Sequence, residues 1–134
     1  MIHKATPLNI RAIAVGFATD MFLTQLFVLA LMLVLFDPGS SAECLAQRID
    51  FRLLDLLGLS WGLMFTGLGG FVAARLARAD RYHNAMVTGA LSLLTSLCIN
   101  GEPGDWTYML GLLLTLPAAL LGAYASNHWG DKRA

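Results

Sequence analysis

The chain has 134 residues, a length that suits one domain, and its formal net charge is zero. Hydrophobic residues make up 57% of it and charged residues only 13%, which is about half the charged fraction of soluble domains. A soluble protein of this size could not bury so much apolar surface, so the composition excludes an ordinary soluble domain and predicts an integral membrane protein.

Four apolar stretches are long enough to cross a bilayer, which takes about 20 residues at a rise of about 1.5 Å each. Backbone polar groups in lipid must bond within their own segment, so each stretch is expected to be a helix. The predicted fold is an all-α transmembrane four-helix bundle that forms a single domain over residues 1–134. Its spans are predicted at about residues 10–36, 53–74, 82–100 and 106–127.

The first span contains one charged residue beyond its first turn, Asp20, about 15 Å along the helix from Ile10. This position places the carboxylate near the middle of the bilayer, where such groups face the bundle interior or a water-filled cavity. Two interpretations follow: Asp20 is a proton or cation site, or it is a neutral acid that hydrogen-bonds helices together. Counted from the same end of the bundle, four residues of the other spans lie at similar depth: Thr66, Thr88, Ser92 and Pro117.

The connection over residues 37–52 is polar, but its apolar residues recur at helical spacing after Ser40 and Glu43, which have the spacing of a capping box. A short amphipathic helix is therefore predicted in this outer loop. The same loop contains Cys44, and Cys98 lies near the outer end of the third span. Both would face an oxidising compartment, so a disulfide between them is possible. The sequence does not decide whether it forms, because it does not give the distance between the two cysteines.

The second span carries a small residue at every fourth position, a pattern that lets two helix backbones approach closely. The five positions are Gly58, Gly62, Thr66, Gly70 and Ala74. They are predicted to be helix-packing residues, either inside one four-helix bundle or at an interface between two copies of the chain.

The basic residues are concentrated on one side of the predicted topology. Arg48 and Arg52 lie in the first outer loop, whereas the other Lys and Arg residues lie near the termini and in the turn after the second span. By the positive-inside rule, both termini are predicted to be cytoplasmic. The turn residues Arg75, Arg78 and Arg81 are also candidates to hold anionic lipid head groups.

Signatures of enzymes and metal sites are absent from the sequence. The HExxH, Walker, nucleophile-elbow and glycine-rich dinucleotide motifs do not occur, and the spacing of His3, His83 and His128 matches no known ligand set. We therefore expect a protein that is not an enzyme and has no metal and no cofactor. Its expected partners are the lipid bilayer and, if it associates, itself or another membrane protein, with no nucleic acid.

The segment from Gly69 to Ala77 reads GGFVAARLA and is followed by a short basic turn and His83. Its GG-x-x-A-x-R-x-A pattern resembles one in small uncharacterised bacterial inner-membrane proteins with four spans. The resemblance covers a small part of the chain. It implies a multi-pass protein of the bacterial inner (plasma) membrane and no catalytic residue.

Two functional hypotheses follow from these patterns. The first is a non-enzymatic membrane protein that works by helix–helix association, in which Gly62→Leu and Gly70→Leu are expected to break assembly. The second is a small proton-coupled transporter or channel centred on Asp20, in which Asp20→Asn is expected to abolish flux.

Overall fold

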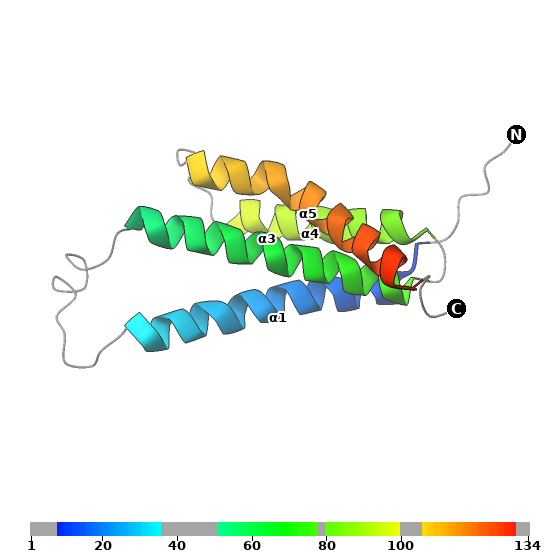
Figure 1. Ribbon diagram of the computed structural model, residues 1–134, viewed down its shortest axis with the longest axis horizontal. Helices are drawn as coiled ribbons and strands as arrows, with labels where there is room; N and C mark the ends of the chain where they lie inside the picture. The colour runs from blue at the N-terminus through cyan, green and yellow to red at the C-terminus, as the bar shows by residue number, and fades with distance from the viewer. Residues whose placement is uncertain (1–7, 36–50, 78–79, 100–105, 131–134) are drawn as a thin grey trace, which may run out of the picture.

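The computed structural model describes residues 8–35, 51–77, 80–99 and 106–130. Over these ranges the chain forms four α-helices: α1 (Ile10–Leu35), α3 (Phe51–Leu76), α4 (Arg81–Ile99) and α5 (Trp106–Gly130). The helices run along the long axis of the molecule, and α1 begins at the same end at which α5 finishes (Figure 1). The all-helical prediction is confirmed over these ranges, whereas the amphipathic helix predicted in the first loop lies outside the described residues.

Three of the helices are long and apolar enough to cross a membrane: Ile10–Leu35, Arg52–Leu76 and Trp106–Trp129. The predicted helix bounds agree with the observed ones to within three residues at each end. The prediction had four spans, but α4, with 19 residues, is not one of these three helices. It is less apolar than the others because charged, amide and hydroxyl side chains occupy many of its positions.

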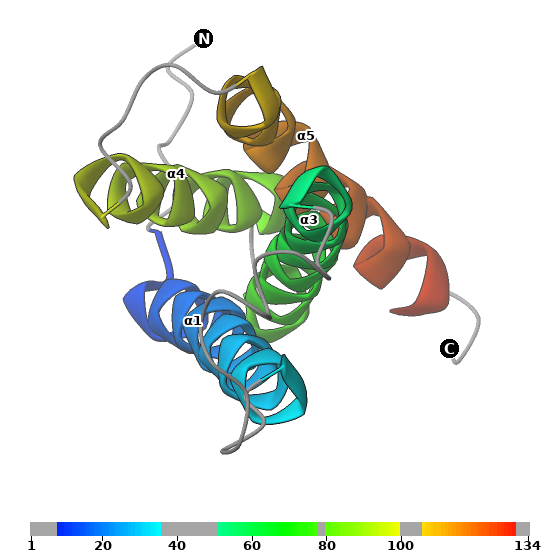
Figure 2. The ribbon, with the colours of Figure 1, turned by 90° about the vertical axis from the view of Figure 1, so that its left-hand side faces the viewer.

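The helix α3 is the centre of the arrangement, because it contacts α1, α4 and α5, and its contact with α5 is the most extensive in the molecule. An end-on view shows α3 between α1 and α5, with α4 on one side (Figure 2). The remaining contacts join α4 to both α1 and α5. Residues of α3 can therefore face each of the other helices in turn.

Close backbone contacts hold together the end of the bundle at which α1 begins. A Cβ atom built on Gly16 of α1 would lie only 2.7 Å from the Cβ of Ala73 on α3. On the other side of α3, a Cβ on Gly70 would overlap the carbonyl oxygen of Ala119 on α5. Small residues are therefore required here because the helix backbones touch.

A buried asparagine joins α1 to α4 at this same end. The side chain of Asn84 is 0% exposed, and its Oδ1 accepts a hydrogen bond of 2.9 Å from the backbone N–H of Asn9. Asn9 in turn caps α1, because its Oδ1 accepts from the N–H of Ala12 at 3.2 Å. The first turn of α1 is thus tied to α4 through the side chains of Asn9 and Asn84.

Candidate functional site

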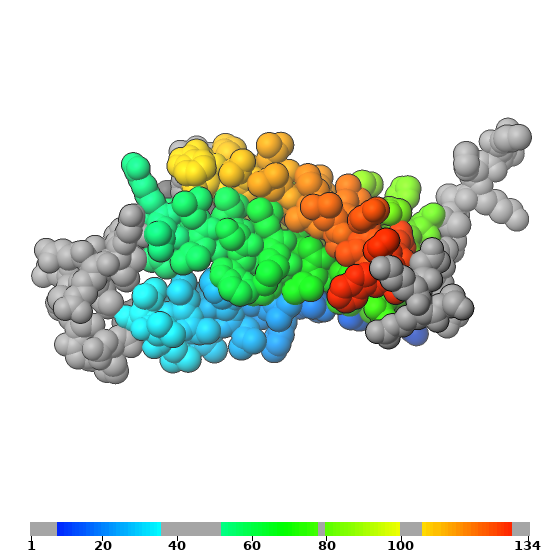
Figure 3. All heavy atoms as spheres, viewed as in Figure 1, coloured from blue at the N-terminus to red at the C-terminus, as the bar shows by residue number. Residues whose placement is uncertain are grey.

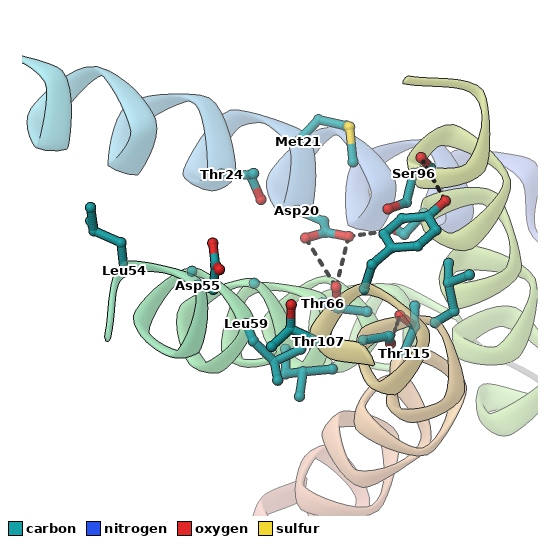
Figure 4. Close-up of a pocket in the computed structure, with 17 residues that line it drawn as sticks. Asp20, Met21, Thr24, Leu54, Asp55, Leu59, Thr66, Ser96, Thr107 and Thr115 are labelled. Carbon is teal, nitrogen blue, oxygen red and sulfur yellow. Dashed lines mark hydrogen bonds between the residues drawn. The ribbon is translucent and has the colours of Figure 1, made fainter. Parts of the chain in front are cut away.

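Asp20 lies in the middle of α1 and is only 2% exposed. It can be buried there because α1 and α3 approach closely next to it: a Cβ built on Gly69 would lie 3.0 Å from the Cβ of Asp20. The carboxylate points away from the exposed face of α1 toward α3 and α4 (Figure 4). The bundle-facing position expected from its depth is the position that the structure gives it.

Two hydroxyl groups from different helices hold the carboxylate. Thr66 of α3 donates to Asp20, with its Oγ1 at 3.4 Å from Oδ1 and 3.3 Å from Oδ2. Ser92 of α4 donates to Oδ2 at 2.5 Å. Both belong to the residues expected at the depth of Asp20, and the acid therefore connects three helices.

The hydroxyl of Ser92 also has a second acceptor, the carbonyl oxygen of Thr88, at 3.2 Å. A hydroxyl has one hydrogen and two lone pairs, so it donates to one acceptor at a time. When Asp20 is ionised, the Ser92 hydroxyl donates to the carboxylate. When Asp20 carries a proton, Ser92 can accept from it and turn its own hydrogen to Thr88. The site therefore offers hydrogen bonds to both protonation states.

Asp20 lines one end of a cavity of about 430 Å³ between the helices. The cavity follows α3 from Leu54 and Asp55 at the beginning of that helix to Thr66 at its middle (Figure 4). Hydroxyl groups line much of it, contributed by Thr24, Thr66, Ser92, Ser96, Thr107, Tyr108 and Thr115. The charged side chains among the described lining residues are Asp20 and Asp55, both acids.

Thr66, the middle one of the five small residues of α3, bonds to Asp20, and the other four form two groups with different surroundings. Gly70 and Ala74 lie in the close contact, and Ala74 belongs to a buried alanine cluster with Ala85 and Ala123. Gly58 and Gly62, by contrast, face open space: a Cβ added to either would meet no atom within 4 Å, and both glycines line the cavity. One half of the pattern thus packs helices, while the other half leaves space beside them.

The remaining predicted residues lie away from the cavity. Arg75 and Arg81 are exposed, and Arg81 donates to the Oδ1 of Asn127 at 2.8 Å. Cys98 is exposed near the end of α4. Arg78 and Cys44 lie outside the described residues, so the disulfide and the complete basic cluster stay predictions.

Two residues of the site and its support were not predicted from the sequence. Asp55 lies near the start of α3, where it reads as an ordinary surface acid, and only the path of the cavity connects it with Asp20. Asn84 sits in the first turn of α4, a common position for a polar residue. The signal for Asp55 was its position on a helix face, because Asp55, Gly58, Gly62 and Thr66 are spaced by three or four residues. Asn84 is spaced in the same way from Thr88 and Ser92 on α4.

No protein-family model matches this chain, and no curated protein or solved structure matches it either.

Proposed function

We propose that the protein is a small non-enzymatic membrane transporter or channel that binds a proton or a small cation at Asp20. The observation that carries this proposal is a buried carboxylate, held by two hydroxyls, at the end of a polar cavity. A carboxylate that only joined helices would not need a cavity beside it. The cavity gives a solute or water a place next to the acid.

The charges of the cavity support a cationic occupant. Both charged side chains among the described lining residues, Asp20 and Asp55, are acids. A buried carboxylate is costly unless a proton or a cation neutralises it, and an anion beside it would raise that cost further. The two acids also mark the two ends of the cavity, so a cation would meet a carboxylate at each end.

The proposed topology has four spans, with both termini in the cytoplasm of a bacterial inner membrane. Three helices have the length and apolarity of spans. The fourth, α4, lies against the other three and places Ser92 beside Asp20, which favours a position for α4 inside the same membrane layer. The orientation rests on the Lys and Arg distribution. In this orientation Asp55 lies toward the periplasmic side.

The deciding experiment is flux measurement in proteoliposomes. Under an imposed pH gradient, we expect the purified chain to move protons, or protons in exchange for a small monovalent cation, and Asp20→Asn to abolish this flux. The matched control is Asp80→Asn, which removes an exposed carboxylate at a bundle end. Asp80 has a φ of 48°, a conformation that asparagine also tolerates. Equal flux through the wild type and Asp20→Asn would refute the proposal.

A second candidate function is helix–helix association with another copy or another membrane protein. The open space at Gly58 and Gly62 favours it, because a close-packing pattern without a helix against it is available to a partner. Gly62→Leu separates the two functions. If the cavity binds a solute, this substitution fills the cavity and reduces flux at an unchanged oligomeric state. If the glycines form an interface, it changes the oligomeric state measured by crosslinking in membranes.

A further inference from the structure

A second hollow, of about 470 Å³, lies between α3 and α5. We call it the α3–α5 groove, and its lining is almost entirely apolar. It is formed by Leu63, Met64, Gly67, Leu68, Phe71, Leu114, Pro117, Ala118, Leu121, Gly122 and Ala125. On the face shown in Figure 3, α3 and α5 lie side by side, as their extensive contact requires.

The floor of the groove is made of small residues. A Cβ on Gly122 would overlap the carbonyl oxygen of Gly67, so the two backbones touch at this point. Larger side chains stand on both sides of this contact, among them Met64 and Leu121, which are 47% and 67% exposed. The result is an open groove with an apolar floor and apolar sides, and such a surface suits a hydrocarbon chain.

A positive charge stands at one end of the groove. Phe71 lines the groove, and the guanidinium carbon of Arg75 lies 5.8 Å from the centre of its ring. Trp129 of α5 meets the same ring edge-on at 6.4 Å. Tryptophan and arginine are typical of the depth at which lipid head groups lie. The groove therefore leads from an apolar stretch to a basic, aromatic end.

We propose that the α3–α5 groove binds one anionic phospholipid, with an acyl chain along the groove and the phosphate at Arg75. From Phe71 to Leu63 the groove follows α3 for about 12 Å, enough for a large part of an acyl chain. Arg75 complements the net negative charge of an anionic head group, whereas a zwitterionic lipid brings an ammonium group as well and a second copy of this apolar face brings no phosphate. The lipid site stands whether or not Asp20 has the proposed function.

The test is native mass spectrometry of the full chain, released from bilayers that contain phosphatidylglycerol and phosphatidylethanolamine in equal amounts. The wild type is expected to retain one phosphatidylglycerol in preference to phosphatidylethanolamine. Arg75→Gln should weaken this retention about fivefold, the effect of removing one basic residue at a lipid surface. The matched control is Arg11→Gln, which removes an exposed charge at the same end of the bundle but away from the groove.

A second variant tests the acyl part of the site. Ala118→Phe places a ring in the groove and is expected to abolish retention of phosphatidylglycerol, with the helix content of the wild type in circular dichroism. Three results would overturn the proposal: equal loss of retention in Arg75→Gln and Arg11→Gln, unchanged retention in Ala118→Phe, or a dimer that releases no lipid. If Ala118→Phe does not fold, Ala125→Leu, a smaller filling of the same groove, replaces it with the same expectation.

Discussion

The Oγ of Ser92 on α4 donates a hydrogen bond to the Oδ2 of Asp20 on α1, although the two residues are 72 positions apart in the chain. This bond and the one from Thr66 join three helices at a single buried carboxylate. The structure thus gives the only acid in the middle of α1 a packing role and a place beside a cavity. The two roles can be separated by measuring stability and flux on the same variants.

Ser92→Ala is expected to lower the free energy of unfolding by about 1 kcal/mol, because it removes one of the two donors to a buried carboxylate. Under the proposed function it also changes the pH dependence of flux, since one partner of the acid is lost. Denaturant unfolding in micelles and flux at several pH values measure the two effects. Ser60→Ala is the control, because Ser60 is exposed and its hydroxyl donates to the carbonyl of Leu56. An equal response of both variants in stability and flux would contradict this account.

Gly70→Ala is expected to destabilise the fold by about 1 to 3 kcal/mol, the usual cost of inserting a methyl group where there is no space. The added Cβ would meet the backbone of Ala119, which cannot turn away as a side chain can. Gly62→Ala adds the same methyl group to the same helix in open space and should cost nothing measurable. Unfolding curves of the two variants test the difference. Similar midpoints would show that the close contact at Gly70 does not limit stability.

Asn84→Ala is expected to cost about 1 to 3 kcal/mol, because it leaves the partly buried N–H of Asn9 without its Asn84 acceptor. The same change removes the bond from Asn84 Nδ2 to the carbonyl of Asp80. Relative to the wild type, hydrogen exchange in this variant should become faster in the first turn of α1 and change less in its middle. Asn127→Ala is the control, since Asn127 accepts a hydrogen bond from the exposed Arg81 and its loss should change stability little. Unchanged exchange at the start of α1 in Asn84→Ala would be evidence against this link.

The proposed orientation predicts that Cys98 reacts from outside the cell. It is exposed near the end of α4, opposite the end at which α1 begins. After mild reduction, a membrane-impermeant maleimide is expected to label Cys98 in intact spheroplasts of a Cys44→Ser variant. A cysteine introduced by His83→Cys, with both natural cysteines replaced by serine, should react only after permeabilisation. The reverse pattern would place the termini outside.

The helices and the level of Asp20 along the bundle could be predicted from the sequence because both follow from local rules. A run of apolar residues fixes a helix in lipid, and the constant rise of the helix fixes the depth of each residue. These two rules were enough to place Thr66 and Ser92 at the level of the acid. The bounds of α1 and α4 were accurate for the same reason.

The contacts between helices could not be predicted, because they depend on the angles at which the helices cross. The small residues of α3 form one regular series in sequence, yet Gly70 touches α5 whereas Gly58 faces open space. Residues four apart turn by about 40° around the helix at each step, so Gly58 points about 120° away from Gly70 and faces the cavity instead of the backbone of α5. Asp55 was not connected with Asp20 because the cavity that both acids line is formed between residues of four helices, and its position depends on how those helices pack.

Leu63 lines both the cavity of Asp20 and the α3–α5 groove, so a single side chain forms part of the wall between them. If both proposed occupants bind, a change in the rotamer of Leu63 on filling one space would change the affinity of the other, and the two spaces would then be coupled. Such a coupling would be reciprocal, so the solute would change lipid binding by the same factor by which lipid changes solute binding. Under the two proposals together, the composition of the surrounding membrane is an effector of the carboxylate site.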